Sequence, residues 1–250
     1  MTIEQSNGID RKSIPYALRV ERFISSDALY QLVHIKQTHV SPTNNSLVRL
    51  IDQIEINPVQ ERILKQLHYL ERVRGIAAIY PEGLVRDSVD NVNKALGYAR
   101  NHLQIMTQQT GIDYLNEFDL NALDRFPAPI PLYGAAAVFS VRSGIPLYAC
   151  ETRKAMDEQI SFFEELKRNG KLKSAGRHPV FTKEREDRLL SFIAEDFLEG
   201  ENRLIVTTYG AKHNFKRAVN DWNNQHPDKK FSLVTITPQM PLKRTDSFFR

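Results

Sequence analysis

The chain has 250 residues, of which 41% are hydrophobic and 26% charged, an ordinary composition for a globular protein with a sizeable core. Its 34 basic residues exceed its 30 acidic residues only slightly, and they are spread along the chain. Nucleic-acid binding needs a clustered basic face, so the composition disfavours a nucleic-acid partner. No apolar run approaches the length of a membrane span, and residues 1–13 lack the apolar core of a secretory signal, so we expect no membrane partner.

Cysteine usage bears on the cellular compartment. The single cysteine, Cys150, cannot form an internal disulfide, and the sequence has no Cys-x-x-Cys pair for zinc. Disulfides are rare in reducing compartments, so these features favour a cytoplasmic setting, with export by a non-classical route as the alternative.

The first part of the chain predicts a strand–helix–strand unit. Residues 1–28 are polar and mixed, and we expect an N-terminal arm or a short peripheral element there. The first predicted strand covers 29–36, a helix begins at Asn57 and ends near Gly75, and a short buried strand covers 76–80. A strand–helix–strand unit implies parallel pairing through a crossover.

The rest of the chain continues this alternation, and we expect one domain over 29–237 followed by a peripheral C-terminal tail over 238–250. The fold class is therefore α/β, with a mixed, mostly parallel sheet flanked by helices. In the helix over 154–168, the apolar spacing of Met156 and Ile160 predicts that this face packs inward. Further helices are expected at 88–106, 134–141 and 182–198, and further strands at 145–150, 203–210 and 231–237.

Polar groups that can do chemistry follow four of the predicted strands. The clearest case is the β-rich run that ends at Gly210 and leads to His213 three residues later. In open α/β sheets the carboxyl edge of the strands is where ligands bind, so these groups are expected to line one cavity. The groups are His39, Glu82, Glu151 with Arg153, and His213.

Two chemical interpretations fit this set. His39, Glu82 and His213 suit a divalent metal with an open coordination position. Without a metal, one histidine could take a proton from water while a carboxylate orients it. In both cases Arg153, with Glu151, could hold a substrate carboxylate or stabilise an oxyanion.

Each residue also has a purely structural alternative. Glu82 could cap a turn, Arg153 could only pair with Glu151, and His213 could be an ordinary loop residue. His34 alternates with two apolar neighbours, which predicts that it faces the far side of the sheet or solvent.

The strand-end motifs resemble a superfamily that includes TIKI proteases, TraB/PrgY proteins, erythromycin esterases and ChaN-type haem-binding proteins. The similarity rests on His39, on Glu82-Gly83, on the stretch Glu-Thr-Arg-Lys-Ala-Met-Asp-Glu-Gln-Ile at 151–160, and on Gly-Ala-Lys-His at 210–213. Lys36 stands where the first Gly-x-x-His motif usually has its glycine. The resemblance implies an α/β fold of two related halves whose motif residues converge on one pocket.

The resemblance also implies a function. We expect a hydrolase of the peptidase or esterase type, with His213 or His39 as base or metal ligand and Glu82 orienting water or binding the metal. Arg153 with Glu151 would position a small-molecule or peptide substrate. The alternatives are a haem or small-ligand binding protein, with the histidines as axial ligands, and a non-catalytic interaction protein on the same fold. Neither the motifs nor the composition indicate an oligomeric state.

Overall fold

A computed structural model describes residues 13–37, 46–86, 89–115, 134–169, 179–197 and 203–239. His39 lies outside these residues, as do the greater part of the predicted connection over 110–131 and the tail after 239. No helix in the described ranges is both long enough and apolar enough to cross a membrane.

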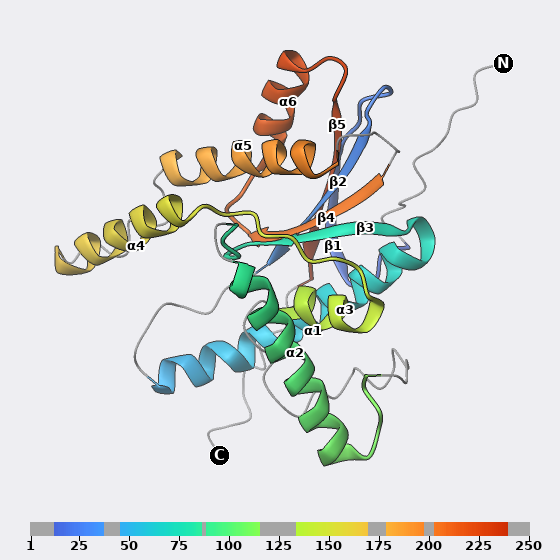
Figure 1. Cartoon of the computed structure of the whole chain (residues 1–250), viewed down its shortest axis with the longest axis vertical. Coiled ribbons are helices and arrows are strands. Elements are labelled where there is room, and N and C mark those ends of the chain that lie inside the picture. The colour runs from blue at the N-terminus through green and yellow to red at the C-terminus, as the bar shows by residue number, and fades with distance from the viewer. Residues whose placement is uncertain are drawn as a thin grey trace.

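The core of the fold is a five-stranded sheet in the order β1-β5-β2-β4-β3 (Figure 1). β2 pairs in parallel with both β4 and β5, β3 pairs in parallel with β4, and β1 is antiparallel to β5. The prediction of a mixed, mostly parallel sheet is therefore confirmed. The strands are β1 (Ala17–Phe23), β2 (Tyr30–Gln37), β3 (Ile76–Pro81), β4 (Arg203–Gly210) and β5 (Phe231–Pro238).

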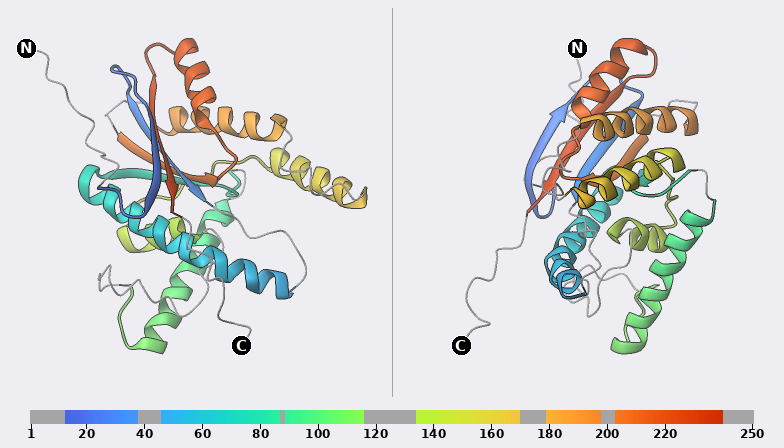
Figure 2. Two further views of the ribbon diagram at one scale, coloured as in Figure 1. Left: turned by 180° about the vertical axis from the view of Figure 1, so that it is seen from behind. Right: turned by 90° about the vertical axis from the view of Figure 1, so that its left-hand side faces the viewer.

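Helices cover both faces of this sheet, as Figure 2 shows. On one face, side chains of α1, α2 and α3 join Val206 and Ile79 of the sheet in one apolar cluster. On the other face, α5 and α6 join Leu32 and Ile205 in a second cluster. The helices are α1 (Ser46–Arg74), α2 (Val89–Thr110), α3 (Gly134–Ser143), α4 (Arg153–Arg168), α5 (Pro179–Asp196) and α6 (Phe215–Gln225).

The central strand β4 shows why the sequence folds in this way. Its residues from Leu204 to Gly210 are all buried. A strand with helices on both faces has no side exposed to water, so its sequence is an almost continuous apolar and β-branched run. The glycine that ends the run leads directly into the turn toward α6.

The four parallel strands form two interleaved strand–helix–strand units. β2, α1 and β3 make one unit, and β4, α6 and β5 make the other. The two units occupy equivalent places in the sheet. If β2 is exchanged with β4 and β3 with β5, the order β5-β2-β4-β3 becomes β3-β4-β2-β5, which is the same order read from the other edge. The exchange also moves α1 and α6 to each other's face of the sheet. The topology is thus that of two related halves, with an axis that runs along the strands between β2 and β4.

Several elements differ from the sequence prediction at their ends. α1 begins at Ser46 and contains Pro58, so Asn57 does not start it. β1 lies inside the predicted N-terminal arm and extends the sheet beyond β5. Residues 145–150 lie beside β3 but form only an isolated bridge with it, between Leu147 and Ile79, and a second isolated bridge joins Glu151 to Val85 after β3. Pro146 has no N–H to donate, which accounts for the broken pairing.

The predicted inward packing of α4 is wrong at Ile160. The helix extends away from the rest of the molecule (Figures 1 and 2), and the side chain of Ile160 is 51% exposed. Ala155 in its first turn is buried. The apolar spacing of α4 therefore marks one face of the helix, and the described residues bury this face only near the start of the helix.

Replacing Val206 by alanine should lower the free energy of unfolding by roughly 1–3 kcal/mol, because it removes methyl groups from a fully buried position. Ile160→Ala, at an exposed position, should change it by less than about 0.5 kcal/mol. Urea denaturation followed by circular dichroism measures both values. Equal effects of the two substitutions would contradict the description of the core.

Candidate functional site

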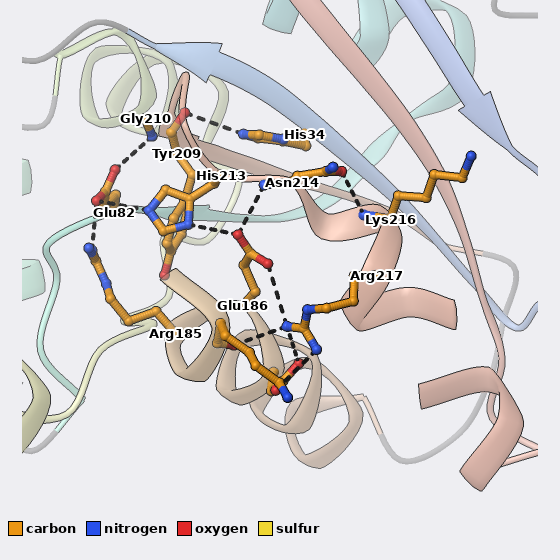
Figure 3. A network of polar contacts seen from close by, with 12 residues as sticks. His34, Glu82, Arg185, Glu186, Tyr209, Gly210, His213, Asn214, Lys216 and Arg217 are labelled. Carbon is orange, nitrogen blue, oxygen red and sulfur yellow. Dashed lines mark hydrogen bonds and ion pairs between the residues drawn. The ribbon is translucent and has the colours of Figure 1, made fainter. Parts of the chain in front are cut away.

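A compact polar network lies at the carboxyl edge of β3 and β4, against the N-terminal part of α5 and the start of α6 (Figure 3). Glu82 follows β3, and His213 lies in the turn after β4, where its N–H donates to the carbonyl of Gly210 at 3.0 Å. His213 Nε2 is 3.6 Å from Glu82 Oε1. The structure therefore brings these two residues selected from the sequence together, and a third, Glu151, joins the same network through Arg185.

Glu82 has a donor at each oxygen. Its Oε2 accepts from the backbone N–H of Gly210 at 2.7 Å, and its Oε1 lies 2.7 Å from Arg185 Nη2. The Glu82 side chain is 13% exposed, so it is the more accessible partner of the Glu82–His213 pair. A carboxylate held at both oxygens is fixed in position at the edge of the sheet.

His213 lies between two carboxylates. Its Nδ1 is 3.2 Å from Glu186 Oε1, and its Nε2 faces Glu82 (Figure 3). Glu186 Oε1 also accepts the backbone N–H of Asn214 at 2.9 Å, at the start of α6. A helix N-terminus favours a negative charge, so α6 and His213 together hold Glu186. Glu186 in turn fixes the orientation of the imidazole.

The protonation of His213 reflects opposing influences. Burial is the largest, and by itself it lowers the pKa of the imidazole. The hydrogen bonds with Glu186 and Glu82 act in the other direction, and together they raise the pKa of His213 above its ordinary value, although Arg185 opposes them. The imidazole therefore gains protons more readily than a free histidine does.

Arg185 is the cation at the centre of the network. It is buried, it donates through Nε to both oxygens of Glu151 at 2.9 and 3.0 Å, and its Nη2 bonds both Glu151 and Glu82. Tyr209 Oη donates to Glu151 Oε1 at 3.0 Å. Burial lowers the pKa of Arg185, but the two carboxylates outweigh it and raise the pKa, so the guanidinium stays charged.

The sequence reasoning missed Arg185 and Glu186, although a signal for them exists. The apolar stripe of α5 includes Leu189, Leu190 and Ile193, all buried. Counting back one helical turn from Leu189 and Leu190 reaches Arg185 and Glu186. Charged residues in line with a buried stripe indicate a buried ion pair rather than a solvated face.

Arg153 does not join the network. It is exposed at the start of α4, where it lines an open groove along that helix with Asp157 and Phe162. The Thr152 hydroxyl accepts the backbone N–H of Ala155 at 3.2 Å and caps the helix, so Arg153 lies in its first turn. The predicted pairing of Arg153 with Glu151 is replaced by Arg185.

His34 is a second buried histidine in this region. It lies on the face of the sheet opposite its neighbours Val33 and Ile35, as the alternation predicts, but α6 covers it, so the alternative that it faces solvent is wrong. Its side chain is fully buried, and its ring meets Phe215 of α6 edge-on at 4.9 Å. Its Nε2 lies 3.3 Å from the carbonyl oxygen of Tyr209. Burial, the main cause, lowers the pKa of His34 to about 3, so the imidazole stays neutral.

The described residues do not make up a metal centre. In the ranges that the structure describes, no group of three or more His, Cys, Asp or Glu side chains is arranged to hold a metal ion. The oxygens of Glu82 already bond Gly210 and the guanidinium of Arg185. Both ring nitrogens of His213 face carboxylates, so acting as an axial haem ligand would cost one of those contacts. The metal set that includes His39 stays a prediction.

Replacing Arg185 by methionine should lower the free energy of unfolding by about 3–5 kcal/mol, because it leaves two inward-facing carboxylates without their counter-charge. Arg153→Met, at an exposed position, should cost less than about 1 kcal/mol. Urea denaturation at neutral pH measures both. A similar small loss for both variants would show that Arg185 does not hold the network together.

Replacing Glu186 by glutamine should lower the pKa of His213, because it removes the charge that favours the imidazolium. The pKa of His213 is raised in the folded protein, so protonation of His213 stabilises the fold. This stabilisation is fully present below the unfolded-state pKa of about 6.5, and it is lost as the pH rises through the folded-state pKa. NMR titration of the imidazole measures the shift. Asp221→Asn is the matched control, because Asp221 also bonds Arg217. An unmoved His213 pKa in Glu186→Gln would contradict the geometry.

Comparison with known proteins gives no match: no family model, no curated protein and no solved structure is similar to this chain. The resemblance to the TIKI, TraB and erythromycin esterase superfamily thus stays a prediction based on the motifs. The chemistry of the site has to be inferred from its own residues.

Proposed function

We propose that this protein is a hydrolase of the peptidase or esterase type in which His213 is the general base. The observation that supports the proposal is the position of His213, oriented at Nδ1 by Glu186 while Nε2 faces Glu82 at the edge of the sheet. A histidine oriented by a carboxylate on one nitrogen is the usual partner of an attacking group on the other.

In this proposal a water molecule binds near His213 Nε2 and Glu82. His213 takes a proton from the water at Nε2, and the hydroxide attacks the acyl carbon of the substrate. His213 then returns the proton to the leaving alcohol or amine when the acyl bond breaks. Glu186 stabilises the imidazolium that exists between the two transfers. Positioned acid–base groups of this kind contribute about 10²–10⁴-fold to rate.

Glu82 and Arg185 have supporting roles in the same mechanism. Glu82 orients the water, since it is the most exposed of the carboxylates that surround Arg185 and His213. Arg185 holds Glu82 in place through an ion pair of 2.7 Å. In this proposal the cation of the site is Arg185, not Arg153 as the sequence suggested. Glu151 is then the buried carboxylate that holds Arg185 in place.

The superfamily resemblance supports the same class of reaction, and the proposed substrate is accordingly a small molecule or a peptide. We also propose a cytoplasmic location, because the single cysteine is free and buried, and so contributes no disulfide to the fold.

The test is hydrolysis of a panel of aryl esters and fluorogenic peptides by the purified protein. His213→Asn and Glu186→Gln should each lower kcat/KM by about 10²-fold or more on any active substrate. The acid limb of the pH profile should move to lower pH in any residual activity of Glu186→Gln, since the His213 pKa falls. His226→Asn, at the far end of α6, is the control and should stay active.

Other outcomes would decide against this assignment. Activity that survives His213→Asn would remove the general base. Activity lost on chelation and restored by a divalent cation would favour the metal-dependent form with His39. A Soret band after adding haem, without hydrolysis of any substrate, would favour the haem-binding alternative.

A further inference from the structure

One peptide group connects the buried His34 with Glu82. The carbonyl of Tyr209 faces His34 Nε2 at 3.3 Å, and the N–H of Gly210 donates to Glu82 Oε2 at 2.7 Å (Figure 3). These two groups belong to the same peptide bond, whose atoms lie close to one plane. Rotation of that plane would change both contacts together.

We propose that His34 is a positioning residue of the site, which fixes the Tyr209–Gly210 peptide and through it the carboxylate of Glu82. The inference rests on the proposed function, because the geometry that it maintains is the one in which Glu82 faces His213 Nε2 at 3.6 Å. His34 does not touch the reacting groups in this scheme.

The surroundings of His34 explain why a core-packing role is insufficient. The side chain is fully buried on the same face of β2 as Leu32, which is part of the apolar cluster with α5 and α6. His34 Nδ1 is also buried, and none of the described residues forms a hydrogen bond with it. Burying such a polar atom without a partner is unfavourable, and an aliphatic residue would avoid that cost. The imidazole can form a hydrogen bond with the Tyr209 carbonyl, and a leucine side chain cannot.

The chemistry of the contact fixes the state of His34. A carbonyl oxygen only accepts hydrogen bonds, so Nε2 must carry the proton and Nδ1 the lone pair. The neutral form is also the one that burial favours. Charged or titratable groups near this ring are Lys36 on the same strand, and His213 and Glu82 at the edge of the sheet. The donor at Nε2 is therefore present whenever His34 is neutral.

The test compares two substitutions at this position by NMR. His34→Gln places an amide N–H₂ near the position of Nε2, whereas His34→Leu removes the donor and keeps an apolar side chain. The readout is the chemical shift of the Gly210 amide proton, which reports its hydrogen bond to Glu82. The Glu82→Gln variant is the reference, because it shows where this signal lies when the charged acceptor is removed. Thr207→Val is the control, because it deletes a different buried bond between strands, from Thr207 Oγ1 to the Tyr80 carbonyl at 2.7 Å.

We expect His34→Leu to move the Gly210 amide signal toward its position in Glu82→Gln, and His34→Gln to keep it near the wild-type position. Thr207→Val should also leave it near wild type. An unmoved signal in His34→Leu, or equal movement in both His34 variants, would overturn the proposal.

A second measurement uses the wild-type protein and so does not depend on the folding of a variant. Long-range ¹H–¹⁵N spectra of the histidine rings should show His34 with its proton on Nε2, and a proton on Nδ1 would refute the assignment. Neither NMR measurement requires turnover. A protein that hydrolyses nothing would thus refute the proposed function without deciding the role of His34, which the Gly210 signal decides by itself.

Discussion

The buried ion pairs of Arg185 are the interaction on which the site depends. This one side chain of α5 bonds Glu82 after β3 and Glu151 in the segment beside β3. Three stretches of chain that are distant in sequence are thereby held at one edge of the sheet. Charges buried in this way are costly unless each is paired, so the two carboxylates and the guanidinium have to be in place together. Glu82 can face His213 because Arg185 holds it there.

The sequence indicates the strand-end members of the site more directly than the helical ones. Glu82 and His213 follow short apolar runs, and the rule that ligands bind at the carboxyl edge of a parallel sheet selects them. Arg185 and Glu186 lie on a helix, where charged side chains usually face water, so only their alignment with the buried stripe of α5 could have indicated them. Arg153 was selected together with Glu151 because both follow the predicted strand over 145–150. Nearness along the chain is a poor guide at a helix start, where a capped first turn can face outward.

The fold was predictable to a similar extent. The alternation of apolar strands and amphipathic helices predicted an α/β sheet, which the structure confirms. The neighbours of each strand were not predictable, because periodicity within a strand says nothing about which distant strand pairs with it. β2 and β3 are parallel as expected, but β4 lies between them. Local chemistry caused the smaller differences, such as Pro146 interrupting the pairing beside β3.

The interleaving of the two halves has a consequence for how the protein reaches its native state. β2 pairs only with β4 and β5, which come from the other end of the chain, with Tyr30 beside both Arg203 and Phe231. Contacts of such long sequence separation close large loops and make folding slow. On the ribosome the first half would have no strand partners for β2 until the second half emerges. The site, which takes Glu82 from one half and His213 from the other, would be assembled only when the last strands join the sheet.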